Sequence, residues 1–193
     1  MAKAGWGSRE YVLGLLSGQE LARVPCFSGS ISVTTPGLKS VGLRFNEVHC
    51  DPEKMAIAAA TTYRLFGFES AVVPLDMCVE AEALGSTVDF RLEETLPMFP
   101  AIQVPVAAKI TDLELPKPSS MSARGRIPIV LEAIRLLKQD VGIEVAVATW
   151  IPGPFTLAMH LIQSEDVLVS AVRDSEVVGR SLDLLTDLMI EVA

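Results

Sequence analysis

Cysteine, histidine and basic residues are all scarce in this chain of 193 residues. Its three cysteines, Cys26, Cys50 and Cys78, are odd in number and widely spaced. Such a set fits neither a disulfide framework nor a zinc ribbon, and it suits a reducing compartment. Only 16 lysines and arginines stand against 24 acidic residues, which gives a net charge of −8. A nucleic-acid partner is not expected, because binding to phosphates depends on clustered basic side chains.

A membrane span is not expected either. The stretch that needs a check lies between Glu144 and Glu165, where no charged residue occurs. Residues 152–154, Pro-Gly-Pro, and His160 interrupt it, and a backbone break that faces lipid would be costly. The N-terminus also lacks the basic-then-apolar pattern of a signal peptide. We therefore expect a cytoplasmic protein.

Apolar residues, by contrast, are abundant. Half of the chain is hydrophobic and its mean hydropathy is +0.40. A chain of this length can bury a substantial core, and its apolar surface must be buried either internally or against a partner. We expect a homo-oligomer or a complementary subunit.

Two strand-to-helix junctions are the most informative stretches. A β-rich run over residues 144–151 meets Pro152-Gly153-Pro154 and turns at once into helix-forming residues. An apolar run over residues 71–75 ends at Asp76 and leads into a short helix that carries two glutamates. In α/β proteins the carboxyl ends of parallel strands hold the chemistry, so both junctions predict one rim of a sheet or barrel.

The remaining elements follow from local signals. A helix over residues 51–66 is predicted by Asp51 as cap, Pro52 in the first turn and Gly67 as stop. Further helices are expected from Ser8 towards residue 18, over residues 125–140, and from the acidic entries at residues 164–166 and 174–176, with a linker at 117–120. Three parallel core strands are predicted at residues 24–27, 71–75 and 143–149, with a long loop over residues 28–50. Residues 86–118 are expected to form a small β insertion, with extended pieces at 86–91 and 104–110.

An ordered set of short motifs resembles the uroporphyrinogen decarboxylase superfamily, and within it the corrinoid branch of zinc-dependent methylcobamide:coenzyme M methyltransferases. The motifs occupy residues 21–25, 49–56, 67–69, 73–74, 79–85 and 153–158. The resemblance implies a (β/α)8 TIM barrel. Residues 1–193 would form its amino-terminal part, about the first three βα units plus the insertion.

The resemblance also implies a function, namely methyl transfer from methylcobamide to a thiol that zinc activates. The partner would be a corrinoid cofactor or a corrinoid protein. The family's His-x-Cys pair and later Cys, which bind zinc, have no counterpart in this sequence. We therefore expect no cofactor or metal to be bound by this chain alone, and an incomplete portion of the enzyme. A catalytically silent fragment or subunit that assembles with a partner is the alternative.

Uroporphyrinogen decarboxylation of porphyrin biosynthesis is a second alternative. Those decarboxylases resemble one another in an Arg-rich run just after the first strand, which suits a substrate with eight carboxylates. The corresponding residues here are Cys26 to Ser32, and the next arginine is Arg44. A polyanion would be poorly held without fixed guanidinium groups.

The candidate site residues lie at the predicted rim. Asp76 and Glu80 are the candidate catalytic carboxylates. Substrate or cofactor contacts are predicted for Phe27, Ser28, His49, Met77, Trp150, Gly153, Phe155 and Thr156. The turn at Gly153 could present free amides at a helix N-terminus, although packing alone could also require it.

Structural roles compete with each of these hypotheses. Asp76 could cap the following helix, and one of Glu80 and Glu82 could face solvent while the other caps or pairs. A zinc site from His49, Cys50 and Cys78 is a minor possibility because the ligand spacing is absent. Cys26 and Cys78 are expected to be small buried hydrophobic residues, and His160 a hydrogen-bonded helix residue.

Overall fold

The structure, a computed structural model, describes residues 5–193. The chain forms two compact units. The first comprises Met1–Asp76, Leu92–Met98 and Ile129–Trp150, and the second comprises Met77–Arg91, Phe99–Pro128 and Ile151–Ala193. Each unit is described separately below.

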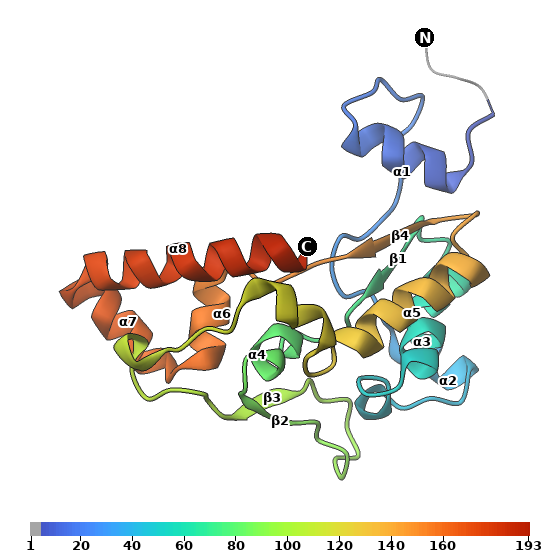
Figure 1. The fold of residues 1–193 in the computed structure, drawn as a ribbon. Coiled ribbons are helices and arrows are strands. Elements are labelled where there is room, and N and C mark those ends of the chain that lie inside the picture. Colours follow the sequence, from blue (N-terminus) through green and yellow to red (C-terminus); the bar gives the residue numbers. More distant parts are fainter. Residues whose placement is uncertain (1–4) are drawn as a thin grey trace. The chain divides into compact units, whose positions relative to one another are not determined.

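The first unit is built on a parallel pair of strands, β1 (Ser70–Val73) and β4 (Ala146–Thr149), with Ser70 opposite Ala146. Every residue of β1 is buried, as expected for a parallel strand covered on both faces. The helices of this unit are α1 (Ser8–Leu16), α2 (Thr35–Ser40), α3 (Pro52–Phe66) and most of α5 (Ile127–Asp140), with a 3-10 turn η1 (Phe45–Glu47). Figure 1 shows α3 and α5 side by side along the strand pair.

Helix α3 confirms the prediction from its termini. The Asp51 carboxylate accepts hydrogen bonds from the amides of Glu53 (2.9 Å) and Lys54 (3.0 Å), and Pro52 occupies the first turn. Gly67 ends the helix in the left-handed conformation, at φ 69° and ψ 25°, which a side chain would strain. Local chemistry alone therefore fixes this element.

The prediction of a third core strand at residues 24–27 is wrong. Among residues 5–193 the parallel sheet has two strands, β1 and β4. Residues 26–28 nevertheless run beside β1, because the Glu69 amide donates to the Cys26 carbonyl (2.8 Å) and Ser28 and Ser70 exchange hydrogen bonds. These contacts do not form a regular ladder, so the segment is extended chain rather than a strand.

The predicted long loop over residues 28–50 is also partly wrong, since it contains α2 and η1. The Thr34 hydroxyl caps α2 by accepting from the Gly37 amide at 3.1 Å, and Pro36 occupies its first turn. A Cβ at Gly37 would lie 2.7 Å from the Thr61 hydroxyl oxygen, so α2 packs directly against α3.

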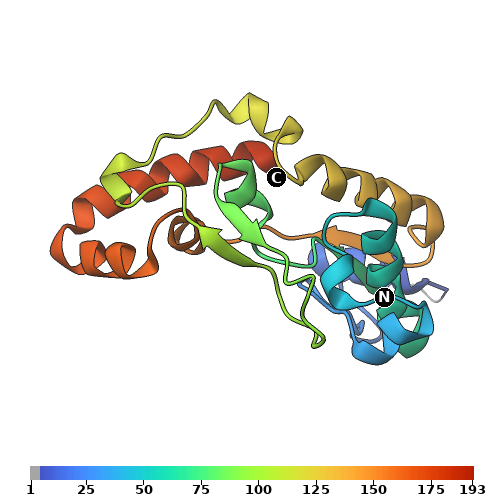
Figure 2. The same cartoon turned by 90° about the horizontal axis from the view of Figure 1, so that it is seen from below.

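The second unit combines a hairpin with helices. Strands β2 (Thr87–Asp89) and β3 (Ala101–Val104) are antiparallel and separate from the β1–β4 sheet, and the insertion over residues 86–118 stays a prediction. The predicted strand at 104–110 is displaced: β3 ends before Pro105, whose missing N–H cannot extend a ladder. The helices are α4 (Val79–Ala83), α6 (Pro154–Leu161), α7 (Ser164–Arg173) and α8 (Ser175–Val192), with 3-10 turns η2 (Ile110–Asp112) and η3 (Pro118–Ala123), where a linker was predicted. Figure 2 shows α6, α7 and α8 packed together, with η3 alongside α8.

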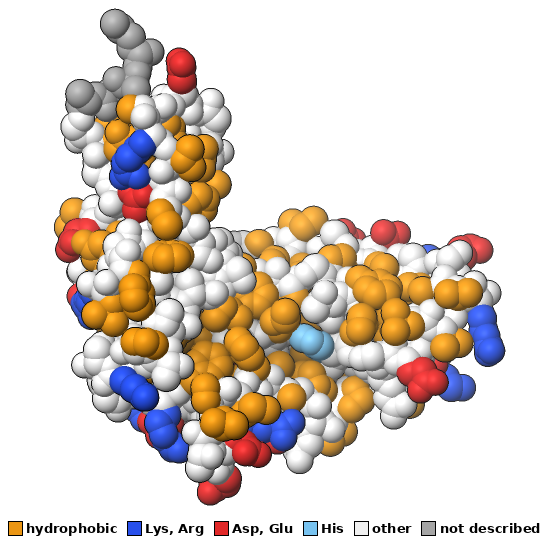
Figure 3. All heavy atoms as spheres, turned by 180° about the vertical axis from the view of Figure 1, so that it is seen from behind, with side chains coloured by type: hydrophobic (Ala, Val, Ile, Leu, Met, Phe, Trp, Pro, Cys, Tyr) orange, Lys and Arg blue, Asp and Glu red, His pale blue; other side chains and the backbone are white. Residues whose placement is uncertain are grey.

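Apolar side chains reach the surface over much of the face in Figure 3. In the second unit the most exposed are Val172 on α7 (87 %) and Ile190 and Leu184 on α8 (68 % and 60 %). Exposed apolar area of this kind is consistent with the high mean hydropathy. Of the helices described, none is long and apolar enough to cross a membrane.

Candidate functional site

The carboxyl end of β1 carries a sealed polar pair. Asp76 follows β1 by three residues, and its Oδ2 lies 2.9 Å from Nδ1 of His49, which precedes α3. Both side chains are fully buried. A carboxylate only accepts, so Nδ1 of His49 donates this hydrogen bond and the imidazole is held in one orientation. The Phe45 ring meets the imidazole edge to face, with centroids 4.9 Å apart.

The pairing with His49 bears on the two interpretations of Asp76. Helix α4 begins after its N-cap residue Cys78, which makes no side-chain cap, and the capping role considered for Asp76 stays a prediction. The predicted position at the strand's end is found, but the carboxylate is turned towards His49 and away from solvent. The sequence predicted Asp76 and His49 as separate site residues. In the structure their side chains are in hydrogen-bonding contact.

Two more candidates of the first unit lie at strand ends. The Trp150 indole N–H donates to the Pro74 carbonyl at 3.0 Å, linking the residue after β4 to the residue after β1. Ser28 donates its amide to the Ser70 hydroxyl (3.0 Å), which in turn donates to the Ser28 carbonyl (2.8 Å). Phe27 precedes it and is half-buried. The Trp150 contact joins the carboxyl ends of β1 and β4, whereas the Ser28 contacts lie at the first residue of β1, at its amino end.

The other five candidates belong to the second unit. Met77 is 44 % exposed, and its carbonyl accepts a hydrogen bond from Nδ1 of His160 at 3.0 Å, which confirms the helix role expected for that histidine. Gly153 precedes α6 as its N-cap residue, without a side-chain cap. Phe155 is exposed and Thr156 is half-buried in the first turn of α6. Their roles stay predictions.

Glu80 and Glu82 share helix α4 but differ in their surroundings. Glu80 is buried, with 4 % of its surface exposed. Glu82 accepts a hydrogen bond of 2.5 Å from Nε of Arg126, whose guanidinium lies over the Phe90 ring. Glu82 pairs, as expected for one of the two glutamates, whereas the expectation that the other faces solvent is wrong, because Glu80 is buried. Arg126 itself is buried, so the pair fixes α4 to the chain before α5.

The amino end of β1 carries a carboxylate that the sequence interpretation left without a role. Glu69 accepts from both terminal nitrogens of Arg23 (2.8 and 2.5 Å) and from the Cys26 amide (2.7 Å). The Arg23 hydrogen bonds lower the pKa of Glu69 most; burial opposes them, and the Cys26 amide and the Ser8 hydroxyl lower it further. The sequence does contain a signal from which this role of Glu69 could have been predicted, because an acidic residue stands directly before a buried apolar strand.

The cysteines differ in burial, and only one of the two predictions made for them is confirmed. Cys78 is buried as predicted, whereas the prediction for Cys26 is wrong, since it is exposed where the chain passes the end of β1. Among residues 5–193, no three His, Cys, Asp or Glu side chains come together in a way that could hold a metal ion. The described side chains thus offer no set of ligands that fits zinc.

Comparison with known proteins decides the family. The sequence matches the family described as uroporphyrinogen decarboxylase (URO-D) over residues 8–193. The chain belongs to the URO-D family. Among its relatives, methylcobamide:CoM methyltransferase MtaA of Methanosarcina barkeri is 30% identical over 182 residues, which cover 94% of this chain and 52% of that protein. A uroporphyrinogen decarboxylase of Syntrophotalea carbinolica is 27% identical over 123 residues, covering 63% of this chain and 33% of that enzyme.

A solved structure gives the same branch of the URO-D family. A methyltransferase from Methanosarcina mazei superposes with a TM-score of 0.86 at 26% sequence identity, covering 97% of this chain and 54% of that one. The α/β fold expected from the resemblance is confirmed. The chain spans about half the length of the curated methyltransferase relatives it matches.

Proposed function

We propose that this chain contributes the amino-terminal part of a corrinoid-dependent methyltransferase, which transfers a methyl group from methylcobamide to a thiol. The carrying observation is that a methyltransferase relative aligns over 94% of the chain at 30% identity, whereas the decarboxylase relatives align over 62% to 76% of it at 24% to 27% identity. The corrinoid, or a corrinoid protein, would be its partner.

The arginines near the first strand support this choice. Arg23 is engaged by Glu69, and Nε of Arg44 lies 2.5 Å from Oε1 of Glu47. Neither guanidinium is available to a substrate with many carboxylates without losing its present partner. A porphyrinogen decarboxylase would need such groups, so decarboxylation is the weaker alternative.

In the first unit, Asp76 is the proposed catalytic carboxylate, and Phe27, Ser28 and Trp150 are proposed substrate contacts. In the second unit, Glu80 is the proposed catalytic carboxylate, and the proposed contacts are Met77, Gly153, Phe155 and Thr156. His49 would hold Asp76 in a single orientation, because the 2.9 Å hydrogen bond is sealed from water. A bound corrinoid would supply the methyl group. The thiol would lose its proton to a base or to solvent, and its sulfur would form the new bond to the methyl carbon as the carbon's bond to the corrinoid breaks, with that electron pair left on the corrinoid.

The proposal is tested by supplying methylcobalamin and coenzyme M to the purified protein, with and without a separately produced carboxyl-terminal half of MtaA. We expect methylated thiol only when the second half is present, with a loss of about 100-fold for Asp76→Asn. Conversion of uroporphyrinogen instead would establish the alternative. If the two halves associate but no methyl transfer occurs, the chain is a silent subunit and the proposal is wrong.

A further inference from the structure

A small hollow in the first unit has no role in the proposed chemistry. Its volume is about 140 Å³. One wall is α2 with the turn that follows it, and the opposite wall is the loop of residues 94–97. We name this hollow the 92–98 pocket, after the segment Leu92–Met98 that contains the loop. Apolar side chains provide most of its lining surface, and they are Leu38, Leu43, Phe45, Leu96 and Pro97.

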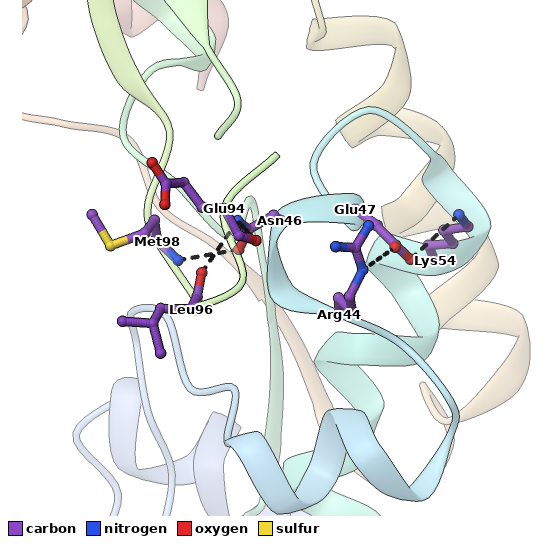
Figure 4. Close-up of polar contacts among 7 residues, drawn as sticks. All are labelled: Arg44, Asn46, Glu47, Lys54, Glu94, Leu96 and Met98. Carbon is purple, nitrogen blue, oxygen red and sulfur yellow. Dashed lines mark hydrogen bonds and ion pairs between the residues drawn. The ribbon is translucent and has the colours of Figure 1, made fainter. Parts of the chain in front are cut away.

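The loop wall is held by one buried amide. Asn46 is only 3 % exposed, and its Nδ2 donates to the carbonyls of Glu94 (3.4 Å) and Leu96 (3.3 Å). Its Oδ1 accepts from the Met98 amide at 3.1 Å. Figure 4 shows all three contacts converging on the one side chain. Asn46 thus pairs with the loop as a neighbouring strand would, through both its donor and its acceptor.

The opposite wall is rigid for a different reason. Gly37 brings α2 against α3 so closely that a Cβ would meet Thr61 at 2.7 Å. Beside the pocket, Glu47 joins Arg44 (2.5 Å) and Lys54 (3.9 Å) in a chain of ion pairs, also drawn in Figure 4. Both walls are therefore fixed before any ligand arrives, which reduces the entropy lost on binding.

Size and lining select the ligand class. Pockets for drug-sized molecules occupy about 300–1,000 Å³, so a hollow of about 140 Å³ is too small for a cofactor-sized ligand. An apolar cavity of about 150 Å³ is known to accept benzene or xenon. Leu38 (5 % exposed) and Phe45 (8 %) form a buried apolar part of the lining, which a small apolar ligand would contact, whereas the charged residues Lys39, Arg44 and Glu94 also line the pocket.

We propose that the 92–98 pocket is a binding site for a small apolar group, an aromatic ring or a branched aliphatic chain of about benzene size. Asn46 is the residue that shapes it. The site is independent of the proposed methyl transfer, since none of its lining residues is a candidate for that chemistry.

Benzene is a suitable probe, with the methyl NMR signals of the leucines as the readout. We expect saturable shifts at Leu38, Leu43 and Leu96, and little change at Leu168 and Leu184, which are exposed elsewhere. Leu43→Trp should fill the pocket and abolish the shifts. Asn46→Ala should weaken binding about tenfold, because it removes the hydrogen bonds that fix the loop wall.

Several results would overturn the proposal. They are no saturable shift in the wild-type protein, equal shifts at the exposed leucines, or shifts that persist in Leu43→Trp. Circular dichroism checks that each variant is folded. If Asn46→Ala does not fold, Asn46→Asp replaces it, because it keeps the acceptor for Met98 and loses only the two donors. Undiminished binding in a folded Asn46 variant would show that this side chain does not shape the site.

Discussion

The two ends of β1 each hold a buried carboxylate, but the partners differ. At the amino end, Glu69 binds the half-exposed guanidinium of Arg23 and a backbone amide. At the carboxyl end, Asp76 binds the imidazole of His49, and both side chains are fully buried. One pair faces water on its cationic side, whereas the other is sealed within the first unit.

The difference in burial between the two pairs agrees with the different roles of the two strand ends in parallel α/β folds. The amino ends of barrel strands usually serve stability, and the carboxyl ends hold the reacting groups. Arg23 is always charged, so its pair with Glu69 is a permanent ion pair. The pair of His49 and Asp76 is held away from solvent instead, with both side chains fully buried.

The largest effect is expected at the sealed end. Asp76→Ala leaves the donor of His49 without its carboxylate in a dry environment, which should lower the free energy of unfolding by about 3 kcal/mol. Urea denaturation followed by circular dichroism measures it. A loss no greater than that of an exposed ion pair would show that the pair does not stabilise the fold.

The amino end should respond less. Glu69→Ala removes two hydrogen bonds from Arg23 and one from the Cys26 amide, but water can replace them at the exposed guanidinium. We expect a loss of about 2 kcal/mol in the same denaturation experiment. If Glu69→Ala costs more than Asp76→Ala, the comparison between the two ends is reversed.

A double substitution sharpens the comparison. His49→Leu with Asp76→Leu replaces both members of the sealed pair by apolar groups, so no buried polar atom of the pair is left without its partner. We expect the double variant to be only about 1 kcal/mol less stable than the wild type, and more stable than Asp76→Ala. A double variant as unstable as Asp76→Ala would mean that shape, rather than hydrogen bonding, sets the cost.

The carboxylate at the amino end of β1, Glu69, should make the stability of the protein depend on pH in the acid range. The pKa of Glu69 in the folded state is below its ordinary value of 4.5, so the unfolded chain takes up the proton first as the pH falls. The stability from Glu69 is therefore present above about pH 4.5 and is lost as the pH falls through the folded pKa. Urea denaturation at a series of pH values should show a shallower decline in Glu69→Gln; an unchanged decline would contradict this assignment.

The smallest effect is expected from a matched exposed pair. Arg135 also donates two hydrogen bonds to one carboxylate, Glu132 (2.7 and 2.6 Å), but both residues lie on the solvent side of α5. Glu132→Ala should leave the denaturation midpoint almost unchanged, since solvent screens the pair. A large shift would show that bidentate geometry matters more than burial.

The sequence predicts best what is encoded within a few residues. Helix α3 follows from Asp51, Pro52 and Gly67 because capping depends on neighbours in the chain. Residues 24–27 have strand-like composition, yet a strand requires a ladder with another segment, and only scattered bonds to β1 form. Helix α2 was missed because Ser, Gly and Thr suggest a loop, while its packing on Thr61 is a long-range contact.

In the candidate site, too, the sequence predicts local features but not contacts between distant residues. The position of Asp76 after a buried run was predictable from alternation and turn signals alone. Its partner His49 lies 27 residues earlier, and no local pattern joins the two. Asn46 was missed for the same reason, since the carbonyls that it binds are about 50 residues away in the chain.

The indole of Trp150 has a practical consequence. Its N–H donates to the Pro74 carbonyl, two residues before Asp76. The chain has two tryptophans, so replacing Trp6 by phenylalanine would leave a single fluorophore beside the strand ends. Its emission colour and lifetime would then report, without any label, whether the tips of β1 and β4 stay joined when a second protein docks.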